Sequence, residues 1–119
     1  MKYLMLIKHA ESIRNEKIPQ GLLDAMGVFV TAQMKSGAIL DTAGLKPTKD
    51  AFRVASKGGK LHVTDGPFAE SKEIVGGYAI GEFKSDKDAR ALANEFMELH
   101  RVHWPEFEGI CEVRPLEDM

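Results

Sequence analysis

Hydrophobic and polar positions along the chain predict a first strand and a first helix. All of residues 3–7 are apolar, a run that is typical of a strand covered on both faces. Between residues 22 and 35 the apolar positions recur at helical spacing, and Gly37 follows as a C-terminal stop signal. Gly27 in the middle of this helix lowers its intrinsic stability by about 1 kcal/mol relative to Ala.

A second helix is predicted after residue 84. Ser85 is a suitable N-cap, with Asp88 three residues further on. Pro105 requires the helix to end at or before Trp104. The apolar stripe of this helix consists of Ala89, Leu92, Ala93, Phe96 and Leu99.

Shorter elements are predicted between and after the helices. Residues 38–40 form a short strand, followed by an irregular loop with Gly44 and Pro47. Gly58-Gly59 joins two alternating runs and predicts a hairpin with a two-residue turn. The register pairs Lys57 with Lys60, Ser56 with Leu61, Val54 with Val63 and Phe52 with Asp65.

Two further strands are predicted, at residues 75–84 and 110–114. In the first, alternation places Val75, Gly77, Ala79, Gly81 and Phe83 on one face, and Tyr78, Ile80 and Glu82 on the other. Glycines inside a strand indicate close approach by a helix, another backbone or a ligand.

The order of elements predicts the α+β class, with two helices on one face of a mostly antiparallel sheet. Helices on one side leave the other side of the sheet uncovered. Because residues 3–7 are apolar on both faces, we expect an identical subunit to cover that side, which predicts a homodimer.

Composition narrows the class of protein. A chain of 119 residues with 44% hydrophobic content is expected to form one domain over residues 1–119. The net charge of -2 arises from scattered charges, so we expect no nucleic-acid partner. Cys111 is the single cysteine, which fits a reducing compartment. The apolar run at the start is too short to span a bilayer, so we expect a cytoplasmic protein without a membrane partner.

The segment VTDGPFAESKE, residues 63–73, carries the candidate site. Asp65 before Gly66-Pro67 is suited either to cap a sharp corner or to present a carboxylate from a rigid loop. Phe68 would anchor that loop by burying its ring. Asp65, Glu70 and Lys72 could also form a polar cluster facing a pocket, where crowded carboxylates raise one pKa for acid/base chemistry, whereas charge in such a loop is often only solvated.

Other polar side chains complete the list of candidates. His62 and Arg53 lie on the polar face of the hairpin. His62 could act as the partner of a catalytic carboxylate, and Arg53 could bind an anionic group of a substrate. The further candidates for ligand contact are Phe68, Lys72, Glu73, Tyr78 and His100. His100 and His103 share a helix face, as metal ligands do, but no acidic or thiol group accompanies them nearby in sequence. We therefore assign no metal and no cofactor.

The strings VTDGPFAESKEIVGGYAI, KYLMLIK, SGAILDTAGLKP and EVRPL resemble the YCII-related family, in particular its DGPF-motif branch. The resemblance extends over essentially the whole chain. It implies a ferredoxin-like subunit that pairs into a dimeric α/β barrel. Most members have no assigned reaction, and some are encoded beside sigma factors and described as regulators or enzymes.

The resemblance also implies a candidate catalytic dyad, because other members of the wider family look as if they use a His and Asp pair. In those members the His lies at the start of the first helix. The corresponding segment here, GLLDAMGVFVTAQMKSG, has no histidine, so that dyad does not transfer. Three functions stay open. The first is a small-molecule-binding or regulatory homodimer. The second is an enzyme for acid/base or cofactor-independent oxidative chemistry on a small organic acid or aromatic, with Asp65, Glu70 or His62 as catalytic groups. The third is a protein partner of the transcription machinery.

Overall fold

The structure is a computed structural model that describes residues 1–68 and 71–118, with the backbone alone at Arg14. Four strands form an antiparallel sheet in the order β2-β5-β1-β6. They are β1 (Lys2–His9), β2 (Ile39–Gly44), β5 (Ile74–Glu82) and β6 (Gly109–Pro115). Strand β1 lies in the centre of this sheet, which agrees with its uninterrupted apolar sequence.

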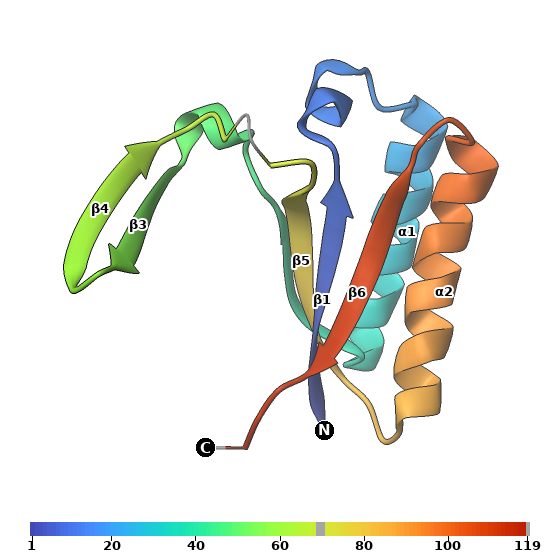
Figure 1. Cartoon of the computed structure of the whole chain (residues 1–119). Coiled ribbons are helices and arrows are strands. Elements are labelled where there is room, and N and C mark those ends of the chain that lie inside the picture. The colour runs from blue at the N-terminus through green and yellow to red at the C-terminus, as the bar shows by residue number, and fades with distance from the viewer. Residues whose placement is uncertain (69–70, 119) are drawn as a thin grey trace.

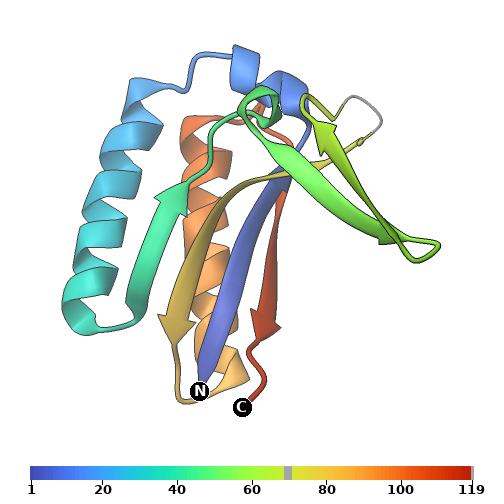
Figure 2. The same cartoon turned by 90° about the vertical axis from the view of Figure 1, so that its left-hand side faces the viewer.

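Two helices, α1 (Gln20–Ser36) and α2 (Asp86–His103), cover one face of the sheet. Seen from the side of the hairpin, the sheet lies in front of α2, and α1 stands beside the edge strand β2 (Figure 2). Each helix connects two strands that have another strand between them in the sheet. This is the ferredoxin-like α+β arrangement, and it confirms the predicted antiparallel sheet with two helices on one face.

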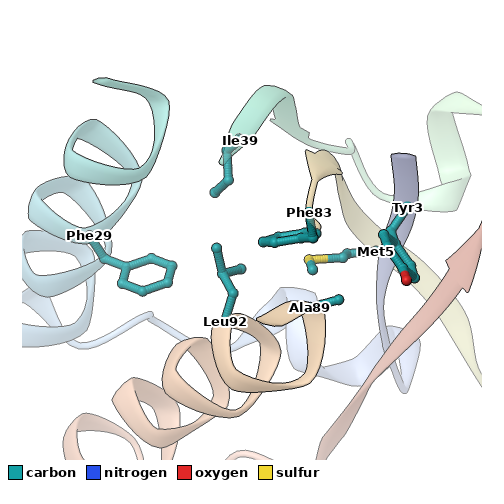
Figure 3. Packing of buried hydrophobic residues seen from close by; sticks show 7 residues of the cluster. All are labelled: Tyr3, Met5, Phe29, Ile39, Phe83, Ala89 and Leu92. Atoms are coloured by element: carbon teal, nitrogen blue, oxygen red, sulfur yellow. The ribbon is translucent and has the colours of Figure 1, made fainter. Parts of the chain in front are cut away.

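The core fills the space between the sheet and the helices (Figure 3). Its buried members are Tyr3, Met5, Phe29, Ile39, Phe83, Ala89 and Leu92. The rings of Tyr3 and Phe83 meet edge to face, with centroids 5.8 Å apart. Most of the buried apolar side chains among the described residues belong to this layer, and burial of apolar surface contributes about 25 cal/mol per Å² to stability.

The helix ends agree with the sequence signals. Gly37 ends α1 in a left-handed conformation with φ of 85°. The backbone N–H of Asp88 donates to Ser85 Oγ at 3.3 Å, so Ser85 is the N-cap of α2. Trp104 follows the last helical residue, His103, as predicted from Pro105.

Two strand predictions need correction. Strand β2 continues to Gly44 instead of ending near residue 40, because its backbone pairs with β5. Strand β5 contains a bulge at Gly76, where the register with β1 shifts. Val75 therefore pairs with Lys8 on the face away from the helices, and only the residues from Gly77 onward keep the predicted alternation.

The hairpin of β3 (Phe52–Lys57) and β4 (Lys60–Asp65) has the predicted register, from Phe52–Asp65 to Lys57–Lys60. Gly58 and Gly59 have positive φ angles of 60° and 76°, as a two-residue turn requires. The hairpin is a separate two-stranded sheet that projects from the side of the main sheet opposite the helices (Figure 1). All its residues are exposed in one subunit.

Candidate functional site

A cavity of about 430 Å³ lies between the helix layer and the sheet. Its volume lies within the range of small-molecule sites, about 300–1,000 Å³. Strands β1, β2 and β5, both helices and the segment before β6 contribute to its walls. Most of the lining is apolar, including Met5, Ile7, Phe29, Val30, Leu92 and Phe96.

His9 at the end of β1 is one of two imidazoles in the cavity wall. Only 7% of this residue is exposed. Its Nδ1 lies 2.8 Å from the carbonyl oxygen of Ala10. Since a carbonyl oxygen only accepts, Nδ1 carries the proton of this hydrogen bond.

Gly76 makes room for the His9 ring. A Cβ atom at Gly76 would lie 2.0 Å from His9 Nε2 and 2.8 Å from His9 Cδ2, well inside van der Waals contact. The β5 bulge and the buried histidine therefore belong to one local structure. The close approach at Gly76 therefore comes from a side chain of the neighbouring strand, and not from a helix, another backbone or a ligand.

His100 is the second imidazole, on α2, and it is also 7% exposed. Its Nδ1 donates to the carbonyl oxygen of Phe96 at 3.0 Å. Burial lowers the pKa of His100 below its ordinary value, and the bond to Phe96 offsets part of that effect. The ring is therefore neutral near pH 7, with its lone pair on Nε2.

An aromatic group joins the two imidazoles. The ring of Phe107 lies 6.1 Å from that of His9 and 4.9 Å from that of His100, between centroids. Trp104 stacks on Phe107 at 5.3 Å. Cys111 also lines the cavity, and burial raises the pKa of its thiol, which keeps the sulfur protonated. This thiol is a weakly polar wall group and not an activated nucleophile.

Asp65 and His62 do not line this cavity. Both are exposed on β4, where Asp65 pairs with Phe52 and His62 pairs with Ala55. Side chains alternate between the two faces of a strand, and these two positions are three residues apart. Asp65 and His62 therefore lie on opposite faces of the hairpin. Glu70, the third candidate catalytic group, lies outside the described residues.

The DGPF corner packs against the turn before β3. Phe68 is 7% exposed, so its ring anchors the loop as expected, and its backbone N–H donates to Thr48 Oγ1 at 3.3 Å. Thr48 Oγ1 in turn donates to Glu11 Oε1 at 2.5 Å. The Gly66-Pro67 peptide is cis. A Cβ at Gly66 would lie 1.7 Å from the carbonyl oxygen of Thr48, so only glycine fits there.

The remaining ligand-contact candidates divide between this corner and the cavity. The Arg53 guanidinium lies 3.6 Å from the centroid of the Phe68 ring, and its NH2 group donates to Ser71 Oγ at 3.1 Å. Neither Arg53 nor Phe68 lines the cavity. Lys72 and Glu73 are exposed beside them, also away from the cavity wall.

Tyr78 and His100 are the two ligand-contact candidates in the cavity lining. The Tyr78 hydroxyl donates to Asp41 Oδ2 at 2.9 Å, and this bond raises its pKa. Register pairs Tyr78 with Leu6 and Ala43. Its side chain therefore shares the face of the sheet opposite the helices, and the strand backbone is the part of Tyr78 that borders the cavity.

Sequence reasoning missed His9, Trp104 and Phe107 as wall residues. The sequence signal for His9 was weak. His9 is a polar residue that continues an apolar strand, and the Gly76-Gly77 pair that makes room for its ring comes far later in the chain. His100 and His103 do not converge, since His100 is buried and His103 is exposed. Within residues 1–68 and 71–118, no group of three or more His, Cys, Asp or Glu side chains is placed to hold a metal ion.

The fold and cavity define a ferredoxin-like α+β protein with a mostly apolar cavity between its helices and its sheet. The family model of the YCII-related domain matches residues 1–99, and the chain belongs to this family. No curated protein matches the chain with significance. In the part of the chain that the structure describes, neither helix has the length and sustained hydrophobicity of a membrane-spanning segment.

Proposed function

We propose that the protein is a small-molecule-binding homodimer of the DGPF-motif branch, in which each subunit binds a ligand between its helices and its sheet. The observation that carries the proposal is the cavity of about 430 Å³, whose apolar walls contain two buried imidazoles. An apolar pocket with a few convergent polar groups is the usual form of a ligand site. The corner Asp65-Gly66-Pro67-Phe68 and the Lys72 and Glu73 that follow support membership of the branch.

The homodimer is supported by apolar surface that one subunit leaves open. Strand alternation opposite Met5 and Ile7 places Leu4, Leu6, Ile80 and Ile110 on the sheet face without helices. On the hairpin, Phe52, Val54, Leu61 and Val63 share one face and are all exposed by more than half. Apolar surface of this extent on two adjacent elements is typical of a subunit interface. A second copy covers both in a sheet-to-sheet dimer.

An acid/base enzyme is the second candidate function. The observation that favours it is the presence of His9 and His100 in one cavity, each with Nδ1 bound to a backbone carbonyl. A neutral, oriented imidazole is a suitable general base. In this version the catalytic groups are the two cavity histidines, and the exposed His62 and Asp65 take no part.

Thermal-shift screening against small organic molecules tests ligand binding. A compound that binds only the folded protein raises the free energy of unfolding by RT ln(1 + [L]/Kd), where [L] is the free ligand concentration. The melting temperature rises as a result. Trp104, the single tryptophan, is 8% exposed and lines the cavity. Its fluorescence should therefore change for compounds that bind in the cavity. A screen without any melting shift or any fluorescence change would contradict the proposal.

A cavity-filling variant assigns the binding to this site. Val30 lines the cavity on α1, and Val28, two residues earlier on the same helix, is exposed. Val30→Trp should abolish the shift given by a bound compound, because the larger ring occupies the cavity. Val28→Trp is the matched control and should retain the shift. Equal loss in both variants would place the ligand elsewhere.

A further inference from the structure

The cavity wall has an imidazole acceptor with an open lone pair, on His100. His9 and His100 both use Nδ1 for backbone carbonyls, which leaves Nε2 as the acceptor in the neutral His100 ring, whereas His9 Nε2 lies directly against Gly76. Among the described residues, Glu11 Oε2 is the one buried side-chain oxygen or nitrogen without a hydrogen-bond partner. Nε2 of His100 is therefore not sealed inside the protein, and the accessible space beside it is the cavity that His100 lines.

The other polar side chains of the wall offer few donors to a ligand. The Thr42 hydroxyl donates to the carbonyl oxygen of Tyr78 at 2.8 Å, so its proton is used within the sheet. The neutral donors that stay in the lining are the indole N–H of Trp104 and the thiol of Cys111. A hydroxyl group on a ligand can donate to an imidazole and accept from a neutral donor at once.

Positive charge is absent from the described lining. None of the described wall residues is Lys or Arg, and Glu16 is the one acidic residue among them. An anionic ligand would lose its water and gain no cation in return, a transfer that is strongly unfavourable in an apolar site. The lining thus disfavours organic acids and favours uncharged molecules.

We propose that the natural ligand of this cavity is an uncharged ring compound with a hydroxyl group of the phenol type. The hydroxyl donates to Nε2 of His100, and the ring packs on the aromatic group of Phe96, Phe107 and Trp104. This inference rests on the proposed binding function and names its ligand class.

Three probes that share a para-ethylphenyl group test the ligand class: 4-ethylphenol, its methyl ether 4-ethylanisole, and the anion 4-ethylbenzoate. Binding to the unmodified protein is measured by titration calorimetry near neutral pH. We expect the phenol to bind about tenfold more tightly than the ether, the value of one buried hydrogen bond, although the ether is larger and more apolar. We expect the benzoate to bind more weakly than both.

Histidine variants then test the assignment of the acceptor. His100→Leu should reduce the phenol-to-ether ratio of affinities toward one, and His9→Leu should reduce it less. His103→Leu, on the same helix but exposed, is the matched control and should keep the ratio. A ratio that survives His100→Leu would overturn the assignment.

The outcomes separate this inference from the proposed function. If the ether or the benzoate binds as tightly as the phenol, the ligand class is wrong while the cavity remains a binding site. If none of the three probes binds but another compound from the screen binds in the cavity, the ligand class is also wrong. If no compound binds at all, both proposals fail.

Discussion

At the scale of residues, His9 and Gly76 form the contact on which the cavity geometry depends. The imidazole is buried and held by its bond to Ala10, and it lies in the space that a side chain at residue 76 would need. Neither residue can change alone without moving the wall. The pair therefore links the local twist of β5 to the polar chemistry of the cavity.

Substitution of Gly76 tests this contact. Gly76→Ala should lower the free energy of unfolding by about 1–3 kcal/mol, since the new methyl group overlaps a buried ring. Denaturant unfolding measures the change. Gly27→Ala is the control: no atom lies within 4 Å of the added Cβ, so removal of a mid-helix glycine should stabilise α1 by up to about 1 kcal/mol.

A further prediction about the same pair uses a double variant. Gly76→Ala combined with His9→Ala should lose less stability than the sum of the two single losses, because the second change removes the ring that the methyl group meets. Additive losses in the double variant would mean that Gly76 is needed for its backbone conformation and not for this contact.

His100 predicts a pH dependence of stability. Its pKa is lower in the folded protein than the ordinary value of 6.5, because burial disfavours the charged ring. The unfolded chain therefore binds the proton more readily, and the contribution of this group is present above pH 6.5 and is lost as the pH falls below it.

Thermal or denaturant unfolding across that range measures the effect. The unmodified protein should lose stability on acidification from about pH 7.5 to about pH 5.5, and His100→Leu should lose less. His103→Leu should follow the unmodified protein, since His103 is exposed. An identical decline in all three proteins would assign the pH dependence to other groups.

At the scale of elements, α2 carries His100 and much of the core, so its N-cap matters for both. Ser85→Ala removes the acceptor for the Asp88 N–H and should lower the free energy of unfolding by about 1 kcal/mol. Equilibrium denaturation gives the value. Ser12→Ala, at an exposed position outside the hairpin, serves as the control and should change stability by less than about 0.5 kcal/mol.

Elements also show where sequence patterns were sufficient and where they were not. The hairpin register, the Gly37 stop and the Ser85 cap follow from local chemistry, and all three are confirmed. The extent of β2 and the bulge at Gly76 depend on pairing with strands far away in the sequence. No local pattern contains that information.

At the scale of the whole molecule, the hairpin is the most direct probe of the proposed dimer. Leu61 on the hairpin and Val28 on α1 are equally exposed in one subunit, at 74% each. In the proposed dimer, Leu61 would be covered and Val28 would stay exposed. Leu61→Lys should therefore weaken association by on the order of tenfold or more, through loss of an apolar contact and burial of a charge.

Sedimentation equilibrium over a range of protein concentrations measures that association. Val28→Lys adds the same charge at a position of the same exposure and should leave the dimer intact. A monomer at all concentrations for the unmodified protein would refute the homodimer. Equal weakening by both lysines would mean that net charge, not the hairpin surface, controls association.

The sequence by itself determined the α+β class, the helix ends, the hairpin turn and the burial of Phe68, because each depends on residues within a few positions of one another or on simple periodicity. Only the tertiary structure decided the site. His9 is far from His100 and Phe107 along the chain, and the three rings meet because β1, α2 and the segment before β6 lie side by side. The DGPF corner, although conspicuous in sequence, packs against Thr48 outside the cavity. Burial and proximity, which set the chemistry of a histidine, are properties of the packed molecule.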